Sequence, residues 1–273
     1  MKPVFLLSCL AAGFACTGIA QEQPGYVQTY CVKVIPGKIS EFEELLADIT
    51  KLAKVRVESG RLASWSILRS VIPSGETARC DYALTSRYEG FPPEPPDRQQ
   101  VQADFRKANI QGTYPDLLTK RDSTSKLVSN DLWRNVAQGE VGAQVEKGGY
   151  VRVNLYKTNP GHMTSEWTKL EIEGWRPFAE AMAKETPGLG WRVRTLFLPA
   201  GTSRQYDGMT TDILPDWAWV GKSPSLSLWD KVHPDQKAQD YLAKVDQAVS
   251  RYKVELYRAV EMITKSNSRQ TEQ

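Results

Sequence analysis

The chain has 273 residues, of which 41% are hydrophobic and 25% are charged, a composition typical of folded globular domains. Its 35 basic and 32 acidic residues leave a formal net charge of only +3, and no basic block stands out along the chain. This excludes the strong electrostatic footprint of nucleic-acid-binding proteins, so we expect neither nucleic acid nor an anionic membrane as a partner.

The first twenty residues, MKPVFLLSCLAAGFACTGIA, carry one Lys, then an apolar run, then small residues before a polar segment. This pattern is typical of a secretory signal peptide, and the apolar run is too short to span a bilayer comfortably. We expect residues 1–20 to be removed after Ala20, which gives an exported protein, periplasmic or secreted. The alternative is a lipoprotein anchored through Cys16, although residues 13–15 lack the Leu usual in such signals.

The first elements after this leader are a strand and a long helix. Residues 26–34 are rich in Tyr, Val and Thr and therefore predict a strand. Ser40 and Glu43 form a capping-box pattern, and apolar residues then recur at helical spacing until Gly60. This predicts an amphipathic helix with one buried face.

Two strands, two helical segments and a final short element complete the unit. We place them at residues 65–72, 80–88, 98–108, 116–126 and 130–136, in that order. The proline-rich run FPPEPPD between the third strand and the next helix predicts a loop. The periodicity of the final element fits either a last strand or the tail of the preceding helix.

The same set of elements occurs twice. Three pairs of segments match in the same order: GYVQTYCVKVIPG with GYVRVNLYKTNPG, WSILRSVIPSGETARCD with WRVRTLFLPAGTSRQYD, and DLWRNV with ELYRAV. Three separated matches in one order indicate a tandem duplication. We assign residues 21–147 to the first repeat and residues 148–273 to the second.

The order strand–helix–strand–strand–helix–strand is that of the ferredoxin-like unit. Its antiparallel sheet carries helices on one face only, and the bare face must pack against something. We therefore predict an α+β fold in which two tandem ferredoxin-like βαββαβ units pack sheet to sheet as an intramolecular α+β barrel. Such a chain is expected to be a monomer with an internal pseudo-dimer.

These features resemble the dimeric α+β-barrel superfamily, and most closely its uncharacterised, exported bacterial members. The resemblance rests on the Tyr-Val strand opening, the Lys-x-x-Pro-Gly turn, the Trp, Pro-x-Gly and Asp spacing, and the Asp131-Leu132-Trp133 and Glu255-Leu256-Tyr257 phrases. Most members associate as two chains, which implies that this protein encloses the pair in one. The superfamily includes cofactor-free monooxygenases, haem-handling enzymes and lactone isomerases, and none of its catalytic motifs is visible at matching positions here.

Alternation along the first strand of each repeat divides its side chains between two faces. We expect the apolar set to face the helices, and it consists of Val151, Val153 and Leu155. We expect the other set to face the space between the sheets and to form a small-molecule pocket lined by Gln28, Tyr30, Arg152, Asn154 and Tyr156. The alternative is a mixed sheet interface whose polar groups satisfy each other.

Two arginines of the second repeat, Arg192 and Arg194, offer a further binding hypothesis. They could hold an anionic ligand through bidentate contacts. Ser66 and Leu68 take their places in the first repeat, so such a site would be one-sided. We prefer to interpret them as the solvated face of an edge strand, because edge strands often carry charge.

Removal of the leader leaves two cysteines, Cys31 and Cys80. In an oxidising compartment they could form a disulfide. The second repeat has Leu155 and Tyr206 at the matching positions, so the repeat does not require a bridge. We therefore favour two buried thiols that serve as small apolar side chains.

The chain has only two histidines, His162 and His233, and they are the only candidates for an axial haem ligand. Histidines in turns more often serve as surface or capping residues, and no zinc pattern is present. We expect no cofactor and no metal. Pro177 is expected to kink the aromatic helix in which it lies, and Asp81 and Asp207 are expected to stabilise turns or to start strands.

Three functional hypotheses follow. The first is an exported small-molecule-binding protein with a ligand cavity between its two ferredoxin-like sheets. The second is a cofactor-independent monooxygenase or isomerase that acts on a small aromatic substrate in the same cavity. The third is a non-catalytic protein-binding scaffold. A cavity of several hundred cubic ångströms would favour the first two, and a filled interior would favour the third.

Overall fold

The computed structural model describes residues 25–73, 77–201, 204–222 and 225–265, and the predicted signal peptide lies outside them. The first half of the chain contains, in order, β1 (Tyr26–Val34), α1 (Ile39–Glu58), β2 (Ser64–Ile72), β3 (Tyr82–Tyr88), α2 (Arg98–Lys107), α3 (Tyr114–Thr124) and β4 (Ser125–Gly142). The second half contains β5 (Tyr150–Thr158), α4 (Thr164–Leu170), the π-helical turn η2 (Glu171–Trp175), α5 (Arg176–Glu185), β6 (Gly190–Leu198), β7 (Gly208–Leu214), the 3-10 turn η3 (Trp217–Trp219), α6 (Leu226–Val232), α7 (Ala238–Ala248) and β8 (Val249–Thr264).

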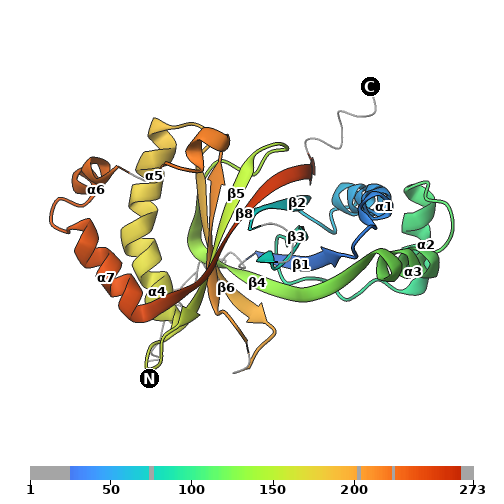
Figure 1. Cartoon of the computed structure of the whole chain (residues 1–273), viewed down its shortest axis with the longest axis horizontal. Helices are drawn as coiled ribbons and strands as arrows, with labels where there is room; N and C mark the ends of the chain where they lie inside the picture. Colours follow the sequence, from blue (N-terminus) through green and yellow to red (C-terminus); the bar gives the residue numbers. More distant parts are fainter. Residues whose placement is uncertain (1–24, 74–76, 202–203, 223–224, 266–273) are drawn as a thin grey trace, which may run out of the picture.

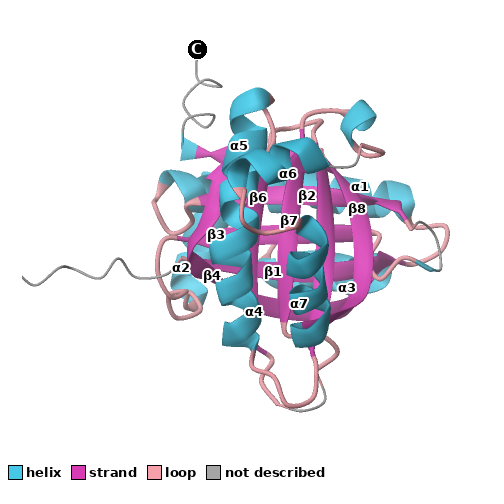
Figure 2. Ribbon diagram, turned by 90° about the vertical axis from the view of Figure 1, so that its left-hand side faces the viewer, coloured by secondary structure: helices cyan, strands magenta, loops and turns pink. Residues whose placement is uncertain are grey.

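The strands form one closed antiparallel barrel in the order β1-β3-β2-β8-β5-β7-β6-β4. Each half contributes four neighbouring strands, and the halves are joined where β2 pairs with β8 and β4 pairs with β6. Figure 1 shows α1–α3 outside the strands of one half and α4–α7 outside those of the other, and Figure 2 shows the second group of helices against the barrel wall. The predicted α+β barrel is confirmed. None of the described helices is both long and apolar enough to cross a membrane.

The final element of the first half is a strand, because residues 130–136 lie within β4. This strand pairs with β1 through its first part and with β6 through its second part. It has 18 residues, and β8 has 16, because each must reach from its own sheet to the sheet of the other half. Periodicity could not distinguish strand from helix here because these long strands change neighbours, and therefore burial, along their length.

The two halves make matching contacts at the turn before their third strand. The backbone N–H of Val34 donates to Asp81 Oδ2 at 2.8 Å, and that of Thr158 donates to Asp207 Oδ2 at the same distance. Asp81 and Asp207 each directly precede the third strand of their half and hold the end of its first strand, so the contacts fit the predicted strand-starting role and not a turn-stabilising one. The predicted repeat boundary at residues 147 and 148 lies in the connection between β4 and β5, and the duplication itself stays a prediction.

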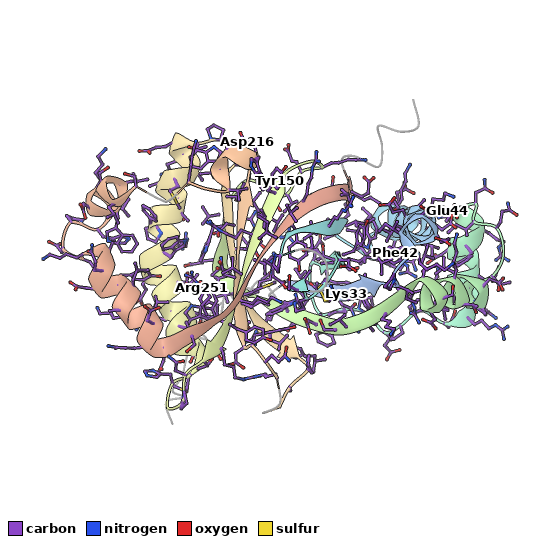
Figure 3. All side chains as sticks on the ribbon, in the orientation of Figure 1. Lys33, Phe42, Glu44, Tyr150, Asp216 and Arg251 are labelled. Carbon is purple, nitrogen blue, oxygen red and sulfur yellow. A yellow bond between two sulfur atoms is a disulfide. The ribbon has the colours of Figure 1, made fainter. Side chains whose placement is uncertain are left out.

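Apolar cores lie between the helices and the outer face of each sheet. In the first half Phe42 of α1 packs against Tyr82 of β3 with ring centroids 5.2 Å apart (Figure 3). In the second half Trp167 of α4 is fully buried in a larger aromatic cluster. The predicted break at Pro177 takes the form of the π-helical turn η2, which ends immediately before the first turn of α5, where Pro177 lies.

Cys31 and Cys80 form a disulfide, so the prediction of two free thiols is wrong. Pairing of β1 with β3 places Cys31 beside the start of β3, and the Cα atoms of the two cysteines are 5.2 Å apart. The comparison of the repeats failed here because the matching residues of the second half, Leu155 and Tyr206, pack in one apolar cluster without a covalent link. Register between strands, which sequence alone does not provide, decided the pairing.

We expect the variant C31S/C80S to lose about 3–4 kcal/mol of unfolding free energy relative to the oxidised protein. The bridge closes a loop with a sequence separation of 49 residues, and its removal releases conformational entropy in the unfolded chain. Urea unfolding with and without a phosphine reductant measures the effect. Reductant should lower the midpoint of the wild-type protein and leave that of the variant unchanged, and equal stability of the variant and the disulfide-bonded wild type would contradict the prediction.

Candidate functional site

A cavity of about 120 Å³ lies inside the barrel, between the sheets of the two halves. Both sheets contribute to its wall, as expected for a space enclosed by two facing sheets. Its lining combines apolar side chains with four arginines and several hydroxyl groups. The polar members are Thr29, Ser64, Ser66, Arg79, Thr85, Arg87, Gln144, Arg192, Arg194 and Thr211.

The side chains that face this cavity are the reverse of those predicted. Val151, Val153 and Leu155 of β5 point into the barrel, together with Val27 and Thr29 of β1. The error has a physical cause: both faces of these strands are buried, one by the opposite sheet and one by the helices. Alternation therefore does not show which face meets which partner.

The five predicted site residues lie on the outer faces of the sheets, beneath or beside the helices. Tyr30 packs with the core under α1, and Gln28 hydrogen-bonds Asn130. Tyr156 packs against Trp167 of α4 with ring centroids 5.1 Å apart.

Arg152 and Asn154 meet at Asp212 of β7, to which they donate at 2.8 and 3.2 Å. The residues of β1 and those of β5 belong to opposite sheets, so the structure does not bring the five together. A ligand role for them stays a prediction, for two separate faces.

Arg192 and Arg194 do not lie on an edge strand, because the barrel is closed and β6 is paired on both sides. Only 3% of Arg192 is exposed, and its guanidinium donates to the carbonyl oxygens of Val141, Trp191 and Ala143. Burial is the main cause that lowers its pKa. The preferred interpretation as a solvated face is therefore wrong. The anion-binding alternative is supported by the position of both arginines in the wall of the cavity.

Arg194 is the cation of the cavity that lacks an acidic partner. Its Nε donates to Asn135 Oδ1 at 2.8 Å and its Nη1 approaches Thr211 Oγ1 at 3.5 Å. It forms no ion pair with any carboxylate in the described part of the chain. Burial lowers the pKa of Arg194 to about 10, with Glu140 opposing and the neighbouring arginines reinforcing this shift. At neutral pH the group is a partly buried cation with unused donors.

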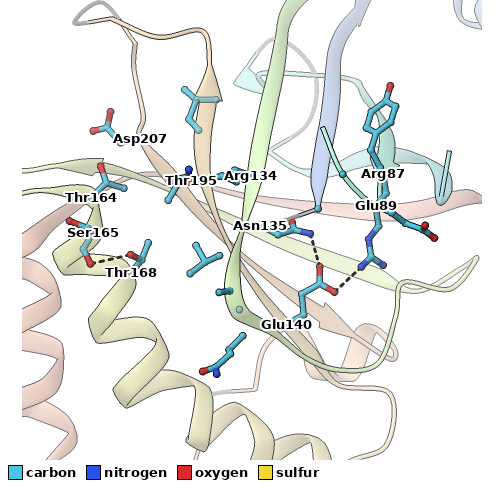
Figure 4. Close-up of a pocket in the computed structure, with 18 of the residues that line it drawn as sticks. Arg87, Glu89, Arg134, Asn135, Glu140, Thr164, Ser165, Thr168, Thr195 and Asp207 are labelled. Carbon is cyan, nitrogen blue, oxygen red and sulfur yellow. Dashed lines mark hydrogen bonds and ion pairs between the residues drawn. The ribbon is translucent and has the colours of Figure 1, made fainter. Parts of the chain in front are cut away.

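Arg87 and Glu140 complete the same cluster (Figure 4). The Glu140 carboxylate accepts from Arg87 Nη2 at 3.2 Å and from Asn135 Nδ2 at 3.1 Å, and it lies 3.7 Å from Arg192 Nε. Two guanidinium groups therefore share one carboxylate, and Arg194 is linked to it only through Asn135. The excess of positive charge favours an anion, since arginines are suited to bidentate contacts with carboxylates and phosphates.

The fourth arginine of the cavity, Arg79, is neutralised from both halves of the chain. It contacts Glu255 at 3.2 Å and Asp131 at 3.6 Å. Each acid also accepts a hydroxyl hydrogen bond of 2.7 Å, from Tyr257 and Tyr206 respectively. The matched Asp131-Leu132-Trp133 and Glu255-Leu256-Tyr257 phrases thus place equivalent acids around one arginine. This cluster is a satisfied polar core, in contrast to the surroundings of Arg194.

Sequence analysis missed Arg79, Arg87 and Glu140. Arg87 occupies an ordinary strand position, and Glu140 joins the cluster only through a bulge in β4. The only sequence signal for this cluster was a difference between the repeats: the second has Arg192 and Arg194 where the first has Ser66 and Leu68.

The two histidines have structural partners. His162 is exposed and hydrogen-bonds Glu166 at 3.0 Å through Nδ1. His233 donates from Nε2 to the carbonyl oxygen of Gly174 at 2.8 Å and packs against Trp229. Within the described residues no group of three or more His, Cys, Asp or Glu side chains is placed to hold a metal ion.

A buried carboxyl also lies outside the barrel. Glu171 of η2 is 5% exposed and accepts a hydrogen bond from Trp167 Nε1 at 3.0 Å. Burial raises the pKa of Glu171 to about 8, against the opposing effect of the Trp167 hydrogen bond. The nearby Tyr241 hydroxyl is buried without a hydrogen-bond partner. The carboxyl is therefore neutral at physiological pH and packs as a core group.

No protein-family model matches the chain, and no curated protein matches it in sequence. A provisionally assigned monooxygenase from Fusobacterium nucleatum is 10% identical with a TM-score of 0.52, over 89% of this chain and 95% of that one. One from Lactobacillus acidophilus is 8% identical with a TM-score of 0.49, over 89% and 97%. A heme-binding protein from Thermus thermophilus is 8% identical with a TM-score of 0.48, over 91% and 95%. At such identities the likeness of the Fusobacterium protein shows the fold alone, a dimeric α+β barrel.

We expect the variant E171Q to remove a pH dependence of stability. The ordinary pKa of 4.5 applies to the unfolded chain, and the folded value is about 8. Between these values the folded protein holds the extra proton, so stability is greatest below the unfolded pKa and falls as pH rises through the folded pKa. The slope is at most about 1.4 kcal/mol per pH unit.

Urea unfolding of the wild type, E171Q and the control E173Q at pH 5 to 9 measures this slope. Glu173 lies on the same turn with a side chain that is 65% exposed, so E173Q should behave as the wild type. A wild-type slope that persists in E171Q would show that Glu171 is not the titrating group.

Proposed function

We propose that this protein is an exported small-molecule-binding protein whose ligand is a small anion held inside the barrel. The observation that carries this proposal is the partly buried guanidinium of Arg194, which faces the cavity without a carboxylate partner among the described residues. A charge that is partly removed from water and lacks a counter-charge is costly. An anionic ligand would supply that charge and use the free donors.

The size of the cavity limits the ligand. Pockets for drug-sized molecules measure about 300–1,000 Å³, and this cavity holds about 120 Å³. The space suits an anion of a few heavy atoms, such as formate, acetate or bicarbonate. Thr211 and the neighbouring hydroxyl groups of the wall would serve as further donors to it.

Export is part of the proposal and has two supports. The first is the leader-like composition of residues 1–20. The second is the Cys31–Cys80 disulfide, since disulfides persist in oxidising compartments. We further propose that the chain arose by tandem duplication and acts as a monomer, because its two halves already occupy the places that two chains take in a dimeric barrel.

An enzymatic role in the same cavity is the alternative, as a cofactor-independent monooxygenase or isomerase for a small aromatic substrate. The provisional name of the Fusobacterium protein is its support, and that likeness extends to fold only. The cavity volume weighs against an aromatic substrate, because it lies below the usual range for ligand pockets. Oxygen consumption with a panel of quinols separates the two: sustained turnover would favour the enzyme.

Calorimetric titration of the mature protein with formate, acetate, bicarbonate and phosphate tests the proposal. We expect at least one to bind, and we expect R194M to weaken its affinity by about 10-fold to 100-fold, as for loss of a charged hydrogen bond. R134M is the matched control because Arg134 is exposed in the groove outside the barrel. Unchanged affinity in R194M, or no binding of any anion, would overturn the proposal.

Thermal melting of the same variants separates a ligand-binding role from a structural one. Removal of a partly buried cation that has no acidic partner should leave stability unchanged or improve it. We therefore expect R194M to melt no lower than the wild type in the absence of anions. We also expect it to lose the rise in melting temperature that bound anion gives the wild type. A large loss of stability in R194M would instead identify Arg194 as a structural residue.

A further inference from the structure

The barrel wall is interrupted beside the arginines. In the pairing of β4 with β6, Asn135 lies opposite Arg194 and Glu140 lies opposite Arg192, so residues 136–139 of β4 bulge out against Val193 alone. Gln138 within this bulge has a left-handed φ of 60°. At the equivalent junction of the other half, β2 and β8 shift register at two places, and each shift involves a single residue. Large bulges often adjoin functional sites.

An open groove of about 1560 Å³ lies outside this bulge. Residues 134–140 of β4 form one part of its lining, and residues of α4 form another (Figure 4). Arg87 lines both this groove and the cavity inside the barrel. The groove and the cavity are therefore separated by side chains of the arginine cluster.

That separating layer is polar and reaches water. Glu140 bridges Arg87 and Asn135, and Asn135 in turn accepts from Arg194. The side chains of Arg87 and Glu140 are 38% and 27% exposed. Ion pairs at such exposure are worth little, so they can exchange partners at small cost. Packed apolar side chains would present a firmer barrier.

We propose that the bulge of β4 is the entrance to the barrel cavity, and that Glu140 is its gate, a carboxylate of the protein that occupies the arginines until an anion arrives. This inference rests on the proposed function and adds how the site is reached and regulated. Glu140 balances the charge of Arg87 and Arg192. An entering anion competes with it for the same donors and is repelled by its charge.

Repulsion between two like charges a few ångströms apart at a protein surface corresponds to at least a tenfold change in an equilibrium constant. The variant E140Q keeps the size and hydrogen-bonding capacity of the side chain and removes its charge. We therefore expect E140Q to bind the anion about tenfold more tightly than the wild type. We also expect its association rate to increase, because the entrance no longer carries a negative charge.

Stopped-flow fluorescence measures both quantities, with Trp133 in the cavity wall as the reporter. Acetate and formate serve as probes, and thermal melting checks that each variant is folded. E89Q is the matched control, since Glu89 lines the same groove, is 81% exposed and forms its ion pair with Lys265. It removes one negative charge from the groove without touching the arginines, and we expect rates and affinity like those of the wild type.

Y206F tests whether anions enter elsewhere. Tyr206 belongs to the satisfied cluster around Arg79, and it hydrogen-bonds Asp131 and Arg79 and none of the bulge residues. We expect Y206F to leave the association rate unchanged. Faster association in Y206F together with an unchanged rate in E140Q would place the entrance at the Arg79 cluster and overturn the inference.

The outcomes also separate this inference from the proposed function. If the wild type binds an anion and E140Q binds it equally or more weakly, Glu140 is not a gate and the binding function stands. If neither protein binds any anion of the panel, the proposed function fails and the gate fails with it. Tighter and faster binding in E140Q alone, with E89Q unchanged, supports the gate.

Discussion

Closure of the barrel is the constraint on which the rest of the structure depends. Each half alone would be a four-stranded sheet with two unpaired edges and one bare face. Pairing of β2 with β8 and of β4 with β6 removes all four edges at once. It also turns the bare faces into a shared interior, in which any charged side chain must find a partner because little water reaches it.

The interior meets this requirement in two ways. Around Arg79, acids from equivalent positions of both halves and two tyrosine hydroxyls satisfy the guanidinium. Around Arg194, Glu140 pairs with Arg87 and Arg192 while Arg194 itself contacts no carboxylate of the described residues, so the balance of charge is incomplete. A polar core that is fully satisfied stabilises a fold, whereas an incomplete one is a reason to look for a ligand.

One chain with two halves can differ from a symmetric dimer in this respect. In a homodimer the two-fold axis repeats every inward residue. Here the halves keep matching hydrogen bonds through Asp81 and Asp207. The positions that hold Arg192 and Arg194 in the second half, however, hold Ser66 and Leu68 in the first. The bulge of β4 also has no equal in β8. A tandem chain can therefore specialise one junction for binding while the other remains a plain sheet contact.

The sequence by itself determined the element order and the barrel, because these depend on local patterns and on a match between segments such as those at Gly25 and Gly149. It did not determine which face of β5 looks inward, since helices and the opposite sheet bury both faces equally well. The Cys31–Cys80 bridge and the Arg87, Glu140 and Arg194 cluster depend on register between strands distant in sequence and on a bulge without a periodic signal. Only tertiary structure decides such contacts, because their partners are neighbours across the barrel and not along the chain.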